Sequence, residues 1–370
     1  MGQSRLSGKT FIIAEAGVNH NGSLEQALRL VDAAVRAGAD AVKIQTFQAE
    51  QLASPSAPKA AYQSRTTPAE ESQLEMIRRL QLSDEAQLEI QSYCREQKIV
   101  FLTTPMDPDS LNFVTDTLDL EMFKLGSGDL TNGPLLLKAG QAARKIILST
   151  GMSNLEEVAQ ALGVLAFGLM QSTVVPGKEE FDKALRSEAG KWALRNHVTL
   201  LHCTTAYPTP FHDVNLRAMD AMSAAFNLPV GLSDHTPGIS VAVGAVARGA
   251  KVIEKHLTLD HKLPGPDHRA SLEPDAFHEM VKAIREVEQA LGEGGKTPTP
   301  SELVNVEAAR KSLFAARPIA KGKHYQEEDF IALRPGTGIS PMDMWQLIGQ
   351  KAEKSYQVGE MIQVTGSQRK

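Results

Sequence analysis

Polar side chains that can bind anions, ligate metals or transfer protons stand at the ends of eight short apolar runs in this chain of 370 residues. In chain order the ends carry Glu15, Lys43 with Gln45, Thr103 with Thr104, Lys124 with Ser127, Ser149 with Thr150, His202 with Thr204 and Thr205, Ser233-Asp234-His235, and Glu254-Lys255-His256. In a parallel barrel all strand carboxyl ends open at one face, which holds the active site. Chance would leave some ends apolar, so the pattern predicts an enzyme.

Two lysines, Lys43 and Lys124, lie inside otherwise apolar runs. Burying an ammonium group is costly unless an anion pairs with it. One interpretation is that both bind a phosphate or carboxylate, helped by the hydroxyl groups of Thr104, Ser127 and Ser149. A second is that one lysine forms a Schiff base with a carbonyl substrate. A third is a structural ion pair with Glu15 or Glu254.

Two histidines, His235 and His256, end runs that would be neighbours in a barrel. Imidazoles on adjacent strands can share one divalent ion. No sequence spacing around them identifies a metal, so a hydrogen-bonding role is the alternative for each.

Two proline- and glycine-containing turns carry a charged residue that could reach a site. In Pro-Gly-Pro-Asp-His (264–268), Asp267 would hydrogen-bond a polyol at the mouth of the site, or the segment is simply a rigid turn. In Arg-Pro-Gly-Thr-Gly (334–338), Arg334 is either part of a tight turn or an arginine presented to a neighbouring site.

The elements that must position these residues alternate between short strands and helices. The eight runs are residues 11–15, 41–45, 99–103, 122–125, 145–149, 198–202, 229–233 and 252–255. Each is apolar on both faces, as in a parallel sheet covered on both sides. Eight such units over about 280 residues predict a (β/α)8 TIM barrel. The alternative is an open doubly wound sheet, but residues 16–22 lack its G-x-G-x-x-G turn.

Helix signals separate most of the runs. The first helix has Ser23 as a plausible N-cap and ends at Gly38. Further signals cover residues 83–96, 109–118, 154–167, 213–226, 239–248 and 274–291. Two longer insertions interrupt the alternation. Residues 49–82, with a helix near 71–80, follow a strand and could form a lid, whereas the charged segment 169–196 is expected at the other end of the barrel.

The composition changes after residue 291. We expect a barrel domain at 1–291, a linker at 292–309 and a small β-rich domain at 310–370, with short strands at 312–315, 331–333 and 361–364 and a helical stretch at 341–347. So small a domain needs to dock onto something to be very stable.

Composition limits the function classes. The chain has 39 Lys and Arg against 44 Asp and Glu, a net charge of -5, which disfavours nucleic acid as a partner. Its two cysteines, Cys94 and Cys203, are too few for a disulfide framework. No apolar run approaches the roughly 20 residues that span a membrane. No signal peptide is evident, so the cytoplasm is the expected compartment.

The motifs together make the sequence resemble the sialic acid synthase family, which includes the N-acetylneuraminate, legionaminate and pseudaminate synthases. The matching stretches fall in order along nearly the whole chain: FIIAEAGVNHNGS (11–23), AGADAVKIQTF (37–47), ESQLEM (71–76), FKLGSGD (123–129), ILSTGM (147–152), LHCTTAYPTPFHDVNL (201–216), GLSDHTPG (231–238), VIEKHLTLD (252–260), GPDHRASLEPD (265–275), RKSLFA (310–315) and LRPGTGISP (333–341). The resemblance implies a barrel followed by a small antifreeze-like (SAF) domain in a domain-swapped homodimer.

The resemblance also implies a reaction. Phosphoenolpyruvate condenses with an open-chain N-acetylated hexosamine to give a nonulosonic acid and phosphate, with Mn²⁺ or Mg²⁺ as the cofactor. Phosphoenolpyruvate would bind to Lys43, Thr104, Lys124, Ser127, Ser149 and Ser233. The metal ligands would be His235 and His256, and Glu15 and Glu254 would move protons or orient water. Gln45, Tyr207 and Asp267 would hold the sugar, and Arg334 would come from the partner subunit. A catalytically inactive sugar-binding protein is the non-enzyme alternative.

Three positions depart from the family pattern. Asp129 stands where many members have Glu, whose side chain is one methylene longer. Aspartate keeps the negative charge but reaches less far. The resemblance implies a catalytic role for this carboxylate near the metal. Thr205 and Ala206 stand where several members have Asn or Glu. Both N-acetylmannosamine and a 2,4-diacetamido-trideoxyhexose are therefore candidate acceptors.

Overall fold

The computed structural model describes residues 8–60, 63, 67 and 70–363, and its first compact unit ends at Gly292. Eight parallel strands form one sheet in the order β3-β2-β1-β8-β7-β6-β5-β4, and β3 also lies beside β4. The strands are β1 (Phe11–Gly17), β2 (Ala41–Thr46), β3 (Val100–Pro105), β4 (Met122–Leu125), β5 (Lys145–Ser149), β6 (Val198–Cys203), β7 (Val230–Asp234) and β8 (Val252–His256). The sheet is a nearly closed barrel, which confirms the predicted fold and excludes the doubly wound alternative.

The two-residue alternation of the strands decides what faces the barrel interior. Phe11 and Ile13 of β1 pack inside with Leu102, Ile147 and Leu201 from other strands. Glu15 follows on the same side of β1, two residues beyond Ile13. The intervening Ile12 and Ala14 belong instead to the large core between the strands and the helices. The lower barrel is therefore an apolar plug, and the polar residues come immediately above it.

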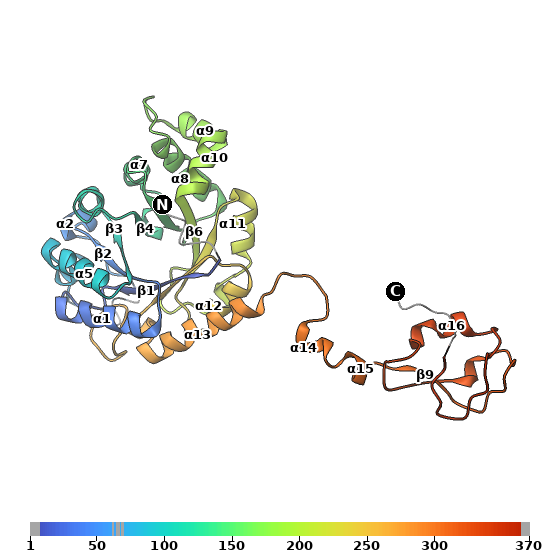
Figure 1. Cartoon of the computed structure of the whole chain (residues 1–370). Coiled ribbons are helices and arrows are strands. Elements are labelled where there is room, and N and C mark those ends of the chain that lie inside the picture. Colours follow the sequence, from blue (N-terminus) through green and yellow to red (C-terminus); the bar gives the residue numbers. More distant parts are fainter. Residues whose placement is uncertain (1–7, 61–62, 64–66, 68–69, 364–370) are drawn as a thin grey trace. The chain divides into compact units, whose positions relative to one another are not determined.

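Helices cover the outside of the barrel (Figure 1). They are α1 (Leu24–Ala37), α5 (Asp84–Glu96), α6 (Pro108–Asn112), α7 (Gly133–Gln141), α8 (Leu155–Leu169), α11 (Ala218–Phe226), α12 (Ser240–Ala247) and α13 (Pro274–Ala290). In α1 the Ser23 hydroxyl accepts the Gln26 N–H at 3.3 Å, and Gly38 ends the helix at φ +83°. Both predicted caps are confirmed.

Two predicted helices have different bounds in the structure. The stretch expected at 109–118 is α6 followed by a π-helical turn, Phe113–Thr117. The helix expected from residue 213 begins at Ala218, because Phe211–Asp213 form a separate 3-10 turn.

The first insertion contains α2 (Ala49–Leu52) and α4 (Gln73–Leu80), which begins with a capping box between Ser72 and Glu75. Met76 and Leu80 of α4 pack against Val18 and Phe47 in a small apolar cluster. The insertion therefore follows β2 at the end of the barrel where the polar residues gather.

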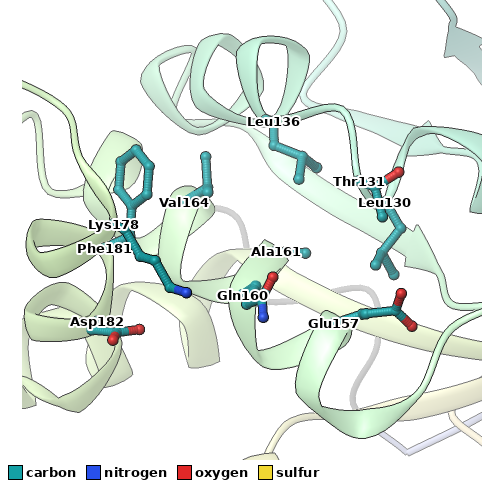
Figure 2. Close-up of a pocket in the computed structure, with 11 residues that line it drawn as sticks. Leu130, Thr131, Leu136, Glu157, Gln160, Ala161, Val164, Lys178, Phe181 and Asp182 are labelled. Carbon is teal, nitrogen blue, oxygen red and sulfur yellow. The ribbon is translucent and has the colours of Figure 1, made fainter.

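The second insertion forms two helices, α9 (Lys178–Arg186) and α10 (Glu188–His197). Together with α7 and α8, helix α9 encloses a cavity of about 260 Å³ (Figure 2). Its charged lining residues are Glu157, Lys178 and Asp182, and it contains none of the residues predicted to do chemistry.

The second compact unit begins at Glu293. It includes α14 (Pro300–Leu303), α15 (Val306–Ala309), α16 (Met344–Leu347) and an antiparallel pair, β9 (Ser312–Ala315) and β10 (Phe330–Leu333). Leu313, Tyr356 and Ile362 lie in its apolar core. The strand predicted at 361–364 is an isolated bridge from Met361 to Phe314, and its residue 364 lies outside the described residues.

Within the second unit, the end of the predicted linker is hydrogen-bonded to the segment after β10. The carbonyl oxygen of Glu307 accepts the Gly336 N–H at 2.7 Å, and that of Ala309 accepts Arg334 Nε at 3.2 Å. The boundaries 292–309 for a linker and 310–370 for a domain stay predictions. Within the described residues, no helix has the length and apolarity needed to cross a membrane.

Candidate active site

A cavity of about 460 Å³ lies at the carboxyl ends of the barrel strands. It brings together every barrel residue predicted for the site except Asp267: Glu15, Lys43, Gln45, Thr104, Lys124, Ser127, Asp129, Ser149, Tyr207, Ser233, His235, Glu254 and His256. Residues that are up to about 240 positions apart in the sequence thus line one space.

Two lysines and two glutamates form a buried charge cluster on the floor of this cavity. Lys43 Nζ contacts Glu15 Oε2 and lies 3.7 Å from Glu254 Oε2. Lys124 Nζ lies 3.2 Å from Glu254 Oε1. All four side chains are at most 5% exposed, so water screens these charges little.

The cluster sets the protonation of its members. Burial raises the pKa of Glu15 to about 7, because the opposing attraction of Lys43 is smaller. Burial would also raise the pKa of Glu254, but Lys124 and Lys43 together outweigh it and lower that pKa below its ordinary value. Burial lowers the pKa of Lys43, whereas Glu15 and Glu254 raise it by more, so it ends above its ordinary value. Lys43 is therefore an ammonium group, which argues against Schiff-base chemistry at this residue.

Hydroxyl groups surround the lysines. Thr104 Oγ1 accepts a hydrogen bond from Lys43 at 3.0 Å, and Ser127 Oγ accepts the Gly151 N–H at 2.9 Å. Ser149 Oγ is buried, and no described residue hydrogen-bonds to it. An unsatisfied buried hydroxyl costs roughly 1–3 kcal/mol. Its presence in the same cavity as two lysines suits the binding of an anion.

The two predicted metal-binding histidines lie close together, with ring centroids 5.5 Å apart and ring planes at 60° to each other. His235 Nδ1 lies 2.9 Å from the carbonyl oxygen of Thr204, which can only accept, so Nδ1 carries the proton. Burial lowers the pKa of His235 and holds the pKa of His256 well below the ordinary histidine value. His235 is therefore neutral, and its Nε2 keeps the lone pair that a metal ligand needs.

The surroundings of His256 also fit a divalent ion. Its Nδ1 is buried without a hydrogen-bond partner among the described residues, and the nearest carboxylate oxygen, Asp267 Oδ2, is 4.0 Å away. The described part of the chain offers no cluster of three His, Cys, Asp or Glu side chains. Two imidazoles would therefore hold the ion only with oxygen ligands from substrate or water, an arrangement that leaves positions open for chemistry.

A glycine allows the close approach of these groups. Gly17 ends β1 at φ +51°, and a Cβ there would lie 2.9 Å from Glu15 Oε1 and 3.6 Å from a ring carbon of His256. A Cβ at this position would therefore displace the Glu15 carboxylate, and the positive φ would strain the backbone of any residue other than glycine.

The predicted Asp129 lies on the 3-10 turn Ser127–Asp129 after β4. Its Oδ1 accepts a 3.2 Å hydrogen bond from Asn132, and burial raises its pKa. The turn places it on the cavity wall with Ser127, and its catalytic role stays a prediction.

Asp267 lines an adjoining cavity of about 310 Å³, which shares Gln45, Tyr207 and His256 with the first. Burial raises the pKa of Asp267 to about 6. Two successive hydrogen bonds connect its backbone to Asn19. Asn19 donates to Ser271 Oγ at 2.8 Å, and Ser271 Oγ donates to the Asp267 carbonyl at 2.7 Å.

Seven apolar side chains of the adjoining cavity, here called the apolar wall, are Val18, Phe47, Leu52, Met76, Ile77, Leu80 and Met106. The polar residues Gln63 and Gln73 line the same cavity. This wall could not be predicted from the sequence, because its residues come from four separate segments and look like ordinary core positions. Cys203, interpreted only as a buried thiol, also lines the main cavity, 3.1 Å from Ser127 Oγ.

Arg334 is the one predicted site residue outside the barrel. It lies in the second unit, at the end of β10, where its Nε donates to the carbonyl of Ala309. Its role at a barrel site stays a prediction.

Comparisons with known proteins agree with this arrangement. Residues 30–296 match the NeuB family, and residues 310–363 match the SAF domain. The chain is 44% identical to N,N'-diacetyllegionaminic acid synthase of Campylobacter jejuni, over 96% of this chain and 99% of that protein. It is 41% identical to the protein of the same name from Legionella pneumophila, over 95% and 93%. The crystal structure of N-acetylneuraminic acid synthetase from Leptospira borgpetersenii, in complex with citrate, covers 81% of this chain and 90% of its own, with 30% identity and a TM-score of 0.65. The predicted resemblance is confirmed, and the chain belongs to the NeuB family.

Proposed function

We propose that this enzyme of nonulosonic acid synthesis condenses phosphoenolpyruvate with an open-chain 2,4-diacetamido-2,4,6-trideoxyhexose and water, releasing phosphate. The observation that carries the proposal is the placement of a buried lysine pair next to two neutral imidazoles in one cavity. The lysines suit a small, highly charged anion, and the imidazoles suit a divalent ion beside it.

Phosphoenolpyruvate would bind over the charge cluster. Its phosphate and carboxylate groups match the ammonium groups of Lys43 and Lys124 and the surrounding hydroxyls of Thr104, Ser127, Ser149 and Ser233. With both glutamates ionised the cluster is neutral. When Glu15 takes up a proton, which its pKa of about 7 allows near neutral pH, the cluster carries one positive charge.

His235 and His256 would hold Mn²⁺ or Mg²⁺. The bound ion would supply Lewis-acid polarisation of the acceptor aldehyde. Gln45, Tyr207 and Asp267, which line the space beside the histidines, would orient the sugar.

The chain's own carboxylates would handle the protons. A bond forms between C3 of phosphoenolpyruvate and the aldehyde carbon, and the aldehyde oxygen takes up a proton. Water adds to C2 and loses one proton. The bond from C2 to the phosphate oxygen then breaks, the new C2 hydroxyl becomes the keto group, and its proton leaves with the phosphate. Glu254, ionised and hydrogen-bonded to Ser233 at 2.7 Å, is suited to orient the water and accept its proton. Glu15 is suited to donate one.

The apolar wall supports a 6-deoxy acceptor. A methyl group at C6 would pack against side chains such as Met106 and Leu52, whereas the hydroxymethyl group of N-acetylmannosamine would lose hydrogen bonds with water there. Both legionaminic acid synthases named above are more than 40% identical to this chain.

We propose in addition that the chain works as a domain-swapped homodimer, with Arg334 serving the partner's site. An Arg334→Ala variant and a His235→Ala variant, each inactive alone, should regain activity when mixed heterodimers form. If such heterodimers form without regaining activity, the site is served within one chain.

The function is tested by phosphate release from phosphoenolpyruvate with Mn²⁺ and, in parallel, the diacetamido sugar and N-acetylmannosamine. We expect a higher kcat/KM for the diacetamido sugar and no release without an acceptor. A higher kcat/KM for N-acetylmannosamine would reverse the choice of acceptor. No turnover with either sugar, together with borohydride trapping of pyruvate on a lysine, would favour the aldolase alternative.

A further inference from the structure

A second buried ion pair, Asp234 with Lys255, lies beside the site without lining it. Lys255 Nζ is 2.8 Å from Asp234 Oδ2, and the two side chains are 1% exposed or less. Lys255 also donates to the Thr236 carbonyl at 2.5 Å. Asp234 Oδ1 accepts both the N–H of Thr236, at 2.9 Å, and its hydroxyl, at 2.7 Å. None of these groups contributes to the wall of the main cavity.

The pair sits directly behind the proposed metal ligands. Asp234 and Lys255 are partners in the ladder between β7 and β8, and Ser233 and Glu254 are the preceding partners. Because neighbouring strand residues point to opposite faces, the ion pair occupies the outer face where Ser233 and Glu254 occupy the inner one. His235 and His256 each follow one member of the pair by a single residue.

The pair also fixes the turn after β7. Thr236 is bonded through its N–H, its hydroxyl and its carbonyl to Asp234 and Lys255. His235, between Asp234 and Thr236, therefore has its backbone held on both sides. Its own carbonyl oxygen accepts the Thr209 N–H at 2.8 Å, which ties the same turn to the loop after β6.

Stability alone does not account for charges at these positions. Both charged side chains are removed from water almost completely, which carries a large free-energy cost. Replacing a buried ion pair by apolar groups of similar size is often neutral or stabilising. The charged groups instead fix geometry. Lys255 of β8 binds both the Asp234 carboxylate of β7 and the Thr236 carbonyl after β7, which holds the two strand ends in one relative position.

We propose that the Asp234–Lys255 pair is a positioning device for the metal site, holding His235 and His256 at the separation that lets both bind one divalent ion. This inference rests on the proposed function, since it presumes that the two histidines bind metal. The pair acts through the strand ends and touches neither substrate nor ion.

The test measures Mn²⁺ affinity rather than turnover. In the double variant Asp234→Asn/Lys255→Met both charges are removed and side-chain volume is nearly kept. We expect it to remain folded and to bind Mn²⁺ about 10- to 100-fold more weakly. This is the usual loss of affinity when a residue that orients a metal ligand, without touching the metal, is replaced. Free Mn²⁺ is titrated by electron paramagnetic resonance on folded protein, with the melting temperature measured alongside.

A matched control uses the other end of the barrel. Asp40 and Arg285 form an ion pair at 2.7 Å there, and Asp40→Asn/Arg285→Met removes it in the same way. This variant should lose stability without changing Mn²⁺ affinity. If Asp234→Asn/Lys255→Met does not fold, Thr236→Val removes one hydroxyl contact and no charge, and a weakening of at least threefold is expected.

The outcomes separate this inference from the proposed function. Unchanged Mn²⁺ affinity in a folded variant of the pair, with affinity lost in His235→Ala, would overturn the positioning role and leave the metal site intact. Absence of saturable Mn²⁺ binding by the unmodified protein would overturn the metal site and this inference with it.

Discussion

Lys124 Nζ lies 3.2 Å from Glu254 Oε1, and the same oxygen accepts the hydroxyl proton of Ser233 at 2.7 Å. One carboxylate thereby links a lysine suited to an anion with a serine next to a candidate metal ligand. Lys124 and Lys43 both contact Glu254, so removing either leaves a buried carboxylate less well compensated. Substrate binding and proton transfer are therefore expected to depend on one another.

Loss of Lys124 should weaken phosphoenolpyruvate binding. A charge-assisted hydrogen bond contributes about 1.5–3 kcal/mol, so Lys124→Met should raise the KM for phosphoenolpyruvate about 10- to 100-fold. Steady-state kinetics at saturating acceptor measure it. The control is Lys251→Met, an exposed lysine just before β8, which should leave the KM unchanged. Equal KM values in both variants would contradict the anion-binding role.

Loss of one histidine should remove metal binding without unfolding the barrel. His256 has no strong hydrogen bond to lose among the described residues, so His256→Ala should keep its melting temperature within a few degrees. Its Mn²⁺ affinity should fall about 100-fold, measured by titration with the metal. His212→Ala, which changes an exposed histidine, is the control. Retained affinity in His256→Ala would contradict the two-histidine site.

The apolar wall should determine acceptor preference. Met106 lines both cavities, and Met106→Gln would give that wall a polar group. A single methyl contact is worth about 1–3 kcal/mol, so the ratio of kcat/KM for the diacetamido sugar over N-acetylmannosamine should fall about tenfold. Met152→Gln makes the same change at a residue that is 70% exposed and lines only the main cavity, and should leave the ratio unaltered. A shift of equal size in both variants would speak against a specific role of the wall.

The second unit should lose stability in acid through Asp329. This buried carboxylate accepts hydrogen bonds from Arg317 and Lys323, each at 2.6 Å. Burial would raise its pKa, but Lys323, Arg317 and a backbone N–H outweigh burial and lower it. A depressed folded-state pKa stabilises above the unfolded-state value, near 3.9, and the contribution disappears as the pH falls through the folded-state pKa.

Asp329→Asn should therefore destabilise this unit by about 1–3 kcal/mol at pH 7 and flatten its dependence on pH below about 4. Fluorescence of Trp345, in a Trp192→Phe background, reports unfolding of the second unit alone. An unchanged acid transition in the variant would rule out Asp329 as its source.

Much of the barrel could be predicted because its strands are short, apolar and bounded by polar residues. The predicted 122–125 and 145–149 coincide with β4 and β5, and the other strands differ by one or two residues at an end. Helix α7 was not predicted: Gly133 and Gly140 weaken its helical pattern, and close packing against α8 at Gly140 compensates. In the second insertion, α9 and α10 pack against α8, and a charged segment does not reveal such contacts.

The site residues could be predicted, whereas their pairing could not. Strand alternation and the barrel topology place Lys43 and Glu254 at one face, but residue types do not tell whether a lysine faces an anion or a glutamate. Lys43 contacts glutamates and also lines an open cavity. The structural ion pair and the anion-binding interpretation therefore both describe this arrangement. The contact between Asp234 and Lys255 depends on the register of β7 against β8, which follows from the assembled barrel and not from either strand alone.

The central claim is tested most directly by the fate of phosphoenolpyruvate labelled with ¹⁸O in the oxygen that bridges C2 and phosphorus. With Mn²⁺ and the diacetamido sugar, the account predicts equal amounts of a nonulosonic acid and of phosphate that retains the label, since the bond from C2 to oxygen breaks. Label retained in the organic product, or phosphate released without an acceptor, would contradict it.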